Sequence, residues 1–206
     1  MSARARSLPQ QQRAREMRRR ILDTALRLIA GRGAAVLTTQ AVADAAHVSI
    51  GTVYRYFPDR AAIVAELVDE AARDISFELV RAVGKALDLD VGAAALVVVE
   101  TLTAAYEKHA PVVQAALTAS SFDVPPHLNH TAMDEIERSL LPLGSAIPGR
   151  ARPDLSPSEL RDLVFLTMGV TSSACLRIAL QRPPGSDRDA MVALTARMLG
   201  AALTPP

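Results

Sequence analysis

The sequence predicts an all-α protein in which a small N-terminal domain of three helices is followed by a larger helical bundle. Apolar residues recur at the spacing of an α-helix through most of the 206 residues. No segment shows the strict alternation of a half-buried strand, and proline and glycine gather in two segments, 142–153 and 183–185. Half of the residues are hydrophobic, which is enough to bury a substantial core and excludes a disordered chain.

Charge is distributed unevenly along the chain. Residues 1–60 contain eleven arginines and four acidic residues, a net charge of +7, whereas the remainder carries −6 and the whole chain +1. A basic module joined to an acidic one suits a protein that binds a polyanion and has a separate control domain. Charge alone leaves the alternative of a solvated basic helix equally open.

Features that report on the cellular compartment favour the cytoplasm. The single cysteine, Cys175, allows no intramolecular disulfide. The N-terminus lacks the apolar core and cleavage site of a signal peptide. The best apolar run, 91–99, ends at Glu100 and is too short to span a bilayer. We therefore expect a cytoplasmic protein with no membrane partner.

The N-terminal sixty residues contain an arm and a helical domain. Residues 1–9 are expected to form a flexible basic arm, in which Arg4 and Arg6 could enter a DNA minor groove. Residues 10–60 form the predicted helical domain. Its first helix covers about 11–30 and ends at Gly31 and Gly33. The arginines at 13–20 could bind phosphate or remain a solvated helix face.

Two short helices with a tight turn between them are predicted over 38–60, TTQAVADAAHVSIGTVYRYFPDR. The first covers 40–46 with Thr39 as N-cap, and the second covers 49–57 with Ser49 as N-cap. The turn falls at His47. Helical periodicity places Val53 and Phe57 on the inner face of the second helix. A bracing helix, a turn and a helix with a free outer face make up a helix-turn-helix DNA-binding domain.

The outer face of the second helix carries the candidate DNA contacts. Thr52 and Arg55 can bond to base edges, and Gly51 allows a close approach of the backbone. The hydroxyls of Tyr54 and Tyr56 and the cation of Arg60 suit phosphate oxygens. The alternatives are a bracing role for Tyr54 and plain surface for Thr52 and Arg55. The candidate DNA-binding residues are Thr39, Ser49, Ile50, Gly51, Thr52, Tyr54, Arg55, Tyr56 and Arg60.

About residues 18–68 resemble the DNA-binding domain of the TetR family of bacterial transcriptional regulators. The resemblance depends on an ordered set of residues at family spacing: Gly33, Thr39, Ala43, Val48, Ser49, Gly51, Thr52, Tyr54, Phe57 and Asp59. It implies an all-helical homodimer whose C-terminal bundle binds a small molecule that controls DNA affinity. Two positions depart from the pattern. His47 replaces a common turn glycine, and Ile50 replaces a common lysine, so its contact with DNA is in doubt.

Residues 61–206 are expected to form the helical domain for effector binding and dimerisation. Helices are predicted from Pro58-Asp59 to about 87 and over 91–108, 111–121, 126–141, 157–180 and 187–203. An effector site needs apolar walls and a few polar groups. The candidates, each of which could instead be an ordinary core residue, are Glu100, Thr103, Tyr106, Gln114, Phe122, Met168, Thr171 and Cys175.

Dimerisation is assigned to the last two helices, because both carry apolar stripes with small residues. These stripes are Leu160, Val164, Thr167, Val170 and Ala174, then Leu194, Met198 and Ala202. A two-fold dimer would bind a near-palindromic operator with its two recognition helices about one DNA turn, or a multiple, apart.

A metal site is the alternative interpretation of one polar set. Asp123, His127, His130 and Asp134 recur at helical spacing, but Pro125 and Pro126 would break the helix between the first two. No metal or cofactor is therefore expected.

The sequence as a whole predicts a homodimeric repressor that a small, largely apolar effector releases from its operator. An activator or an effector-independent regulator with the same fold is the alternative. An enzyme is the least supported interpretation, because no nucleophile–base pair is apparent.

Overall fold

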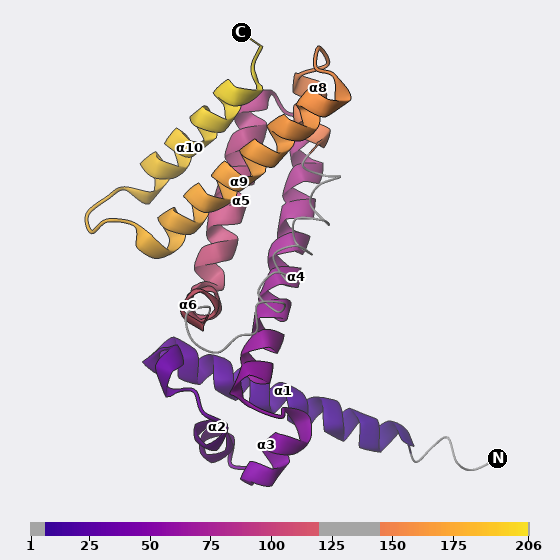
Figure 1. Ribbon diagram of the computed structural model, residues 1–206, viewed down its shortest axis with the longest axis vertical. Helices are drawn as coiled ribbons and strands as arrows, with labels where there is room; N and C mark the ends of the chain where they lie inside the picture. Colours follow the sequence, from indigo (N-terminus) through magenta and orange to yellow (C-terminus); the bar gives the residue numbers. More distant parts are fainter. Residues whose placement is uncertain (1–6, 120–144, 206) are drawn as a thin grey trace, which may run out of the picture. The chain divides into compact units, whose positions relative to one another are not determined.

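The computed structural model describes residues 7–119 and 145–205, and over those ranges the chain is helical and has no strand (Figure 1). This confirms the predicted all-α fold. The described residues divide into two compact units, one with residues 7–70 and 111–119 and the other with residues 71–110 and 145–205. The long helix α4 (Arg60–Ala86) contributes residues to both units. The Asp59 carboxylate accepts a hydrogen bond from the Ala62 amide at 2.8 Å, which fixes the start of α4.

Helix α1 (Ser7–Arg32) starts earlier than predicted, so residues 7–9 of the expected arm are helical. The prediction gave too much weight to Pro9. A proline in the first turn of a helix is tolerated, because its missing N–H would have no intrahelical acceptor. The helix continues through Gly31, two residues beyond the prediction, and ends before Gly33. Gly33 has φ of 79°, and its amide donates to the Ile29 carbonyl at 2.8 Å. Arg4 and Arg6 lie outside the described residues.

The second unit is organised around α5 (Val91–Lys108), which contacts both α9 (Pro157–Gln181) and α10 (Arg188–Leu203). Each of these helices begins at a polar N-cap, Asp90, Ser156 and Asp187 respectively. The predicted capping box at Ser156 is confirmed. Its hydroxyl accepts from the Glu159 amide, and the Glu159 carboxylate accepts from the Ser156 amide at 2.9 Å.

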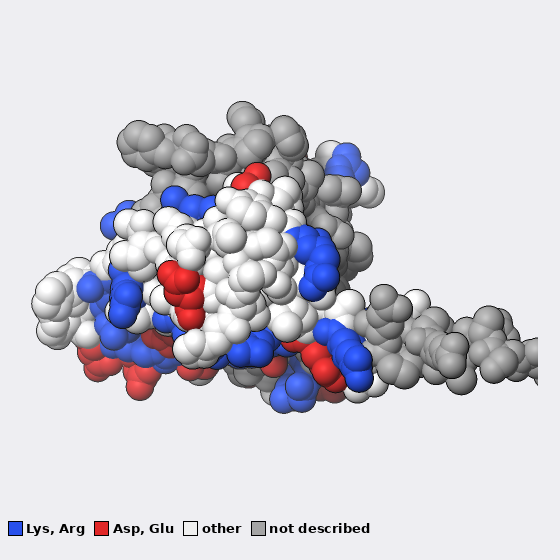
Figure 2. Space-filling model, turned by 90° about the horizontal axis from the view of Figure 1, so that it is seen from below, with Lys and Arg blue, Asp and Glu red and all other residues white. Residues whose placement is uncertain are grey.

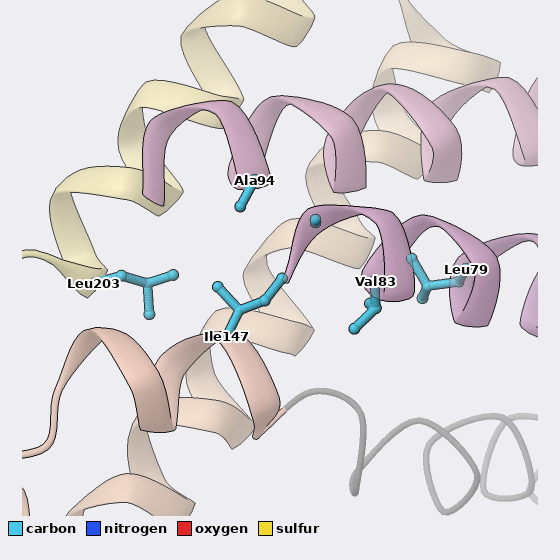
Figure 3. Packing of buried hydrophobic residues seen from close by; sticks show 6 residues of the cluster. Leu79, Val83, Ala94, Ile147 and Leu203 are labelled. Atoms are coloured by element: carbon cyan, nitrogen blue, oxygen red, sulfur yellow. The ribbon is translucent and has the colours of Figure 1, made fainter. Parts of the chain in front are cut away.

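A short helix, α8 (Ala146–Ala151), lies in the segment predicted to be a loop. The prolines of that segment favoured a loop, but Pro148 falls in the first turn of α8. The helix supplies Ile147 to a buried apolar cluster with Leu79, Val83 and Ala86 of α4, Ala94 of α5 and Leu203 of α10. The side chains of this cluster point toward one another (Figure 3). Tertiary packing of this segment therefore favours a helix, although its proline and glycine content favours a loop.

Helix α6 (Ala110–Ala119) belongs to the first unit and matches the prediction for 111–121. The predicted helix over 126–141 lies outside the described residues, as do Phe122 and the set of Asp123, His127, His130 and Asp134. Within residues 7–119 and 145–205, no group of three or more His, Cys, Asp or Glu side chains could hold a metal ion.

Helix α9 differs from the prediction in which face is exposed. Val164 is buried, and Leu160, Thr167 and Ala174 are half-buried. The exposed apolar residues of α9 are Phe165, Leu166 and Val170. Because this helix is apolar on nearly all sides, periodicity could not distinguish its inner from its outer face. On α10 the predicted stripe is exposed, with Leu194 at 50% and Met198 at 60%.

The prediction that 91–99 is the best apolar run, and that it is too short to span a bilayer, overlooked α9. By length and composition it is apolar enough to cross a membrane, and only 22% of its most apolar window is buried. One such helix is weak evidence for membrane insertion, because other kinds of helix pass the same test. What the finding does establish is a helix with much apolar surface left uncovered in the single chain.

Candidate nucleic-acid interface

The two short helices of the first unit are α2 (Thr39–Ala46) and α3 (Ile50–Tyr56). The N-cap of α2 is Thr38 and not the predicted Thr39: its Oγ1 accepts from the Ala41 amide at 3.0 Å. Both threonines can cap, but Thr38 has the extended backbone that an N-cap needs. Thr39 becomes the first helical residue, and its hydroxyl donates to the Tyr54 oxygen at 3.3 Å.

The turn between α2 and α3 is preserved with histidine at its special position. His47 has φ of 53° and ψ of 49°, the left-handed conformation that the sequence predicted for it. Its amide donates to the Asp44 carbonyl at 3.2 Å, and the Val48 amide donates to the Ala43 carbonyl at 3.0 Å. These bonds satisfy two of the last four carbonyls of α2. The turn therefore orients α3 without a glycine.

Helix α3 begins at Ser49, as predicted. The Ser49 Oγ accepts from the Thr52 amide at 3.1 Å and also pairs with the Thr52 Oγ1 at 2.8 Å. The Thr52 hydroxyl is thus oriented by the cap. On the inner side, Val53 and Phe57 are buried, which confirms the predicted inner face.

The outer side of α3 is open to solvent. Gly51 and Arg55 are exposed, and Tyr54 is 53% exposed. The Arg55 guanidinium carbon lies 5.3 Å from the centroid of the Tyr56 ring, within the range of a cation–π contact. Seen from the side of α2 and α3, Lys and Arg side chains lie on either side of a largely uncharged central area that also holds a few acidic side chains (Figure 2). That pattern suits a groove whose walls are phosphates.

The fold itself does not require the glycine at position 51. A Cβ there would meet only the Ser49 Oγ, at 3.9 Å, and the backbone is helical. We therefore expect Gly51→Ala to raise the free energy of unfolding by about 0.5–1 kcal/mol, because alanine favours helices. We expect the same variant to weaken DNA binding, because a methyl group would stand where the backbone approaches the groove.

Thermal denaturation and a DNA titration of the same samples measure the two effects. Gly84→Ala is the matched control, because Gly84 also lies in a helix with nothing within 4 Å of a Cβ. It should stabilise the protein and leave DNA affinity unchanged. Unaltered DNA affinity in Gly51→Ala would contradict a close approach at this position.

Arg60 has a structural contact that the sequence did not reveal. Its Nη2 donates to the Ala34 carbonyl at 3.0 Å and so holds the short 3-10 helix η1 (Ala34–Val36). A guanidinium has five donors, so this bond leaves others for phosphate. Its predicted phosphate contact stays a prediction.

Two arginines of the basic segment 13–20 pair with carboxylates of α4. Arg18 forms two hydrogen bonds with Glu66, that between Nη2 and Oε2 measuring 2.9 Å. Its guanidinium carbon also lies 5.1 Å from the centroid of the Phe57 ring. Arg19 pairs with Asp23 at 3.0 Å and with Glu70 at 3.3 Å. Because Glu66 and Glu70 are distant in sequence, no local pattern indicated these pairs.

The pairing predicts that Arg18 supports the domain without contacting phosphate. Arg18→Met should lower the free energy of unfolding by about 0.5–1 kcal/mol, since the pair is partly exposed. The slope of log affinity for DNA against log salt concentration should not change, because the variant removes no phosphate contact. A slope reduced by about one would instead assign a phosphate contact to Arg18.

The effector candidates fall into three groups. Thr103 and Tyr106 of α5 and Thr171 and Cys175 of α9 are buried within the second unit. Met168 is half-buried beside the apolar cluster, and Glu100 is an exposed ion-pair partner of Arg188 at 3.0 Å. Gln114 lies exposed on α6, in the first unit, and Phe122 lies outside the described residues.

Packing in the second unit also joins residues that the sequence did not single out. The Tyr106 hydroxyl pairs with Ser172 at 2.7 Å. Arg188 of α10 bridges Glu100 and Glu107 of α5, and the bonds to both carboxylates raise its pKa. These contacts cross between helices, so helical periodicity gave no signal for them.

Comparison with known proteins agrees with this architecture. Residues 21–67 match the model of the family described as bacterial regulatory proteins, tetR family. Over 71 residues, 34% of this chain, the sequence is 41% identical to the HTH-type transcriptional repressor KstR of Rhodococcus jostii. The match spans about a third of the length of that repressor, 31%.

Solved structures of similar fold extend over most of the chain. A tetR-family transcriptional regulator from Streptomyces coelicolor aligns with a TM-score of 0.70 at 19% identity, covering 91% of this chain and 80% of that one. Thermus thermophilus FadR, a TetR-family repressor in complex with lauroyl-CoA, aligns with a TM-score of 0.55 at 20% identity, covering 88% and 92%.

The capped α2 and α3, the left-handed turn and the open outer face of α3 define the class of helix-turn-helix proteins. Residues 21–67 form a DNA-binding domain of the kind found in the TetR family of bacterial regulatory proteins. This family consists of transcriptional regulators and not of enzymes.

Proposed function

We propose that this protein is a homodimeric transcriptional repressor that binds a near-palindromic operator through α3 and is released by a small, largely apolar effector. The observation that carries the DNA-binding part is the outer face of α3, where Gly51 and Arg55 are exposed beside an ordered Thr52. Repression is proposed because the matched relative is a repressor.

The proposed DNA contacts divide into two kinds. Arg55 and Thr52 read base edges, and Ile50 meets a thymine methyl group. The phosphate contacts come from the amides at the start of α3, next to Ser49, and from side chains that flank it. Those side chains are Thr39, Tyr54, Tyr56 and Arg60.

The proposed dimer forms through α9 and α10. In the single chain Phe165, Leu166 and Val170 of α9 are at least 60% exposed, and Leu194 and Met198 of α10 at least 50%. Exposed apolar residues in such numbers favour a protein interface. A second copy covers them and satisfies the two-fold symmetry of a palindromic operator.

The proposed effector binds in the second unit. The apolar interior of that unit and the lauroyl-CoA bound by the similar FadR structure support a ligand with a long apolar part. Binding would favour a conformation of α4 that moves the two DNA-binding domains out of register. Such coupling requires a different effector affinity in the two states. The cytoplasm is the proposed compartment.

Gel-shift titration with the intergenic DNA upstream of the gene, with and without acyl-CoA, tests this function. We expect specific binding that the effector weakens. Undiminished DNA binding by protein that demonstrably holds the effector would contradict release. Transcript levels in a deletion strain separate repression from activation, because target genes that fall silent would contradict a repressor.

A further inference from the structure

Helices α5 and α9 enclose a group of buried polar side chains in the second unit. Thr103 and Cys175 are fully buried, Thr171 is 6% exposed and Tyr106 9%. Thr103 and Tyr106 come from α5, and Thr171 and Cys175 from α9. Polar groups this deeply buried need hydrogen-bond partners.

Two of these polar groups have hydrogen-bond partners on the neighbouring helix. The Tyr106 hydroxyl pairs with Ser172 at 2.7 Å. The Cys175 thiol donates to the Val99 carbonyl at 3.6 Å. Val99 lies four residues before Thr103, so its carbonyl is the usual acceptor for a threonine hydroxyl at that position.

The Thr103 hydroxyl has no such partner. It is buried and forms no hydrogen bond with any described residue. Its interaction with the Cys175 thiol lowers the pKa of Cys175, which burial raises. The positions of the two groups do not meet the geometry of a hydrogen bond. An unpaired buried hydroxyl is destabilising. It would gain from a partner that enters from outside the chain.

The surroundings disfavour a negatively charged partner. Burial raises the pKa of Tyr106 and the pKa of Cys175, and the negative charge of Glu100 raises that of Cys175 further. Within residues 7–119 and 145–205, the buried polar or charged side chains, tyrosine and cysteine aside, are Thr24, Thr103 and Thr171. None of these is a cation, so a buried carboxylate would lack a counter-charge.

We propose that Thr103 is the polar anchor of the effector site and that it binds a neutral hydroxyl or carbonyl group on an otherwise apolar molecule, and not a carboxylate. The inference rests on the proposed function, because it assumes that the second unit binds an effector. Leu102 and Ile178, buried on the same two helices, are of the apolar kind that suits the rest of such a molecule.

Three probes of equal chain length test this chemistry on the full-length protein without DNA: 1-dodecanol, 2-dodecanone and dodecanoate. Their binding is measured by displacement of the neutral dye Nile red, at a pH above 7, where the fatty acid is ionised. We expect the alcohol and the ketone to displace the dye at concentrations at least about tenfold below that of the anion.

The variant Thr103→Val removes the hydroxyl and keeps the shape of the side chain. We expect it to weaken binding of the alcohol about five- to tenfold, the value of one buried hydrogen bond. Its melting temperature without ligand should equal or exceed that of the parent, because an unpaired buried hydroxyl is gone. Thr101→Val is the matched control, since Thr101 lies on the same helix but is only half-buried. It should bind the alcohol normally.

The proposal is overturned if dodecanoate binds as well as dodecanol, if neither neutral probe binds, or if Thr103→Val binds the alcohol unchanged. A gel shift on the same samples keeps the two proposals apart. Loss of specific DNA binding with normal selection for neutral probes would contradict the regulator function alone. Normal DNA binding without that selection would contradict the role of Thr103 alone.

Discussion

Replacing Thr52 and Arg55 together by alanine is expected to lower affinity for the operator by about 100-fold. Arg55 is exposed on the outer face of α3, with its guanidinium 5.3 Å from the Tyr56 ring. Each well-placed base contact is worth about 1–3 kcal/mol of discrimination. Affinity for random DNA should fall less than tenfold, because phosphate contacts remain.

The variant should fold normally. Ser49 caps α3 through the backbone amide of residue 52, which alanine retains. Arg81→Ala is the control, because Arg81 is exposed on α4 beyond the helix-turn-helix; operator affinity should be unchanged. Fluorescence anisotropy with operator and scrambled duplexes measures both affinities. An equal loss on the two duplexes would show that these residues contact phosphates and do not read bases.

Val170→Arg is expected to convert the proposed dimer to monomers. Val170 is 60% exposed near the middle of α9, one turn after the exposed Leu166. At a two-fold interface the change would bury two uncompensated charges, at a cost of several kcal/mol. Operator affinity should then fall by at least about 100-fold, because two half-sites are no longer bound together.

Analytical ultracentrifugation measures the oligomeric state directly. The monomer should keep its helix content, because the side chain at 170 is exposed in the single chain. Val80→Arg is the matched control, a valine 40% exposed on α4. This control should remain dimeric. A dimeric Val170→Arg would exclude this face of α9 from the interface.

The sequence predicted the parts of the DNA-binding domain that depend on local physics. Helix periodicity, the cap at Ser49 and the tolerance of His47 for a left-handed backbone are all properties of short segments. Such properties can therefore be recognised in a single sequence, without an alignment. The error at the start of α2 has the same origin, because Thr38 and Thr39 are equivalent in composition and differ only in backbone conformation.

The contacts that the sequence did not predict are those between distant segments. Arg18 meets Glu66, and Tyr106 meets Ser172, across helices whose packing sets the pairing. The faces of α9 could not be assigned for a related reason. A helix that is apolar nearly all round does not reveal which side meets its own unit. The buried state of Thr103 was likewise visible only in the folded chain.

Selection of bound duplexes from a random library tests the central claim most directly, since it requires neither an identified operator nor an identified effector. We expect enrichment of near-palindromic sequences whose half-sites lie about one DNA turn, or a multiple, apart. The Thr52→Ala, Arg55→Ala double variant should enrich none of them. Absence of enrichment by the parent protein, or enrichment of the same sequences by the double variant, would contradict sequence recognition through α3.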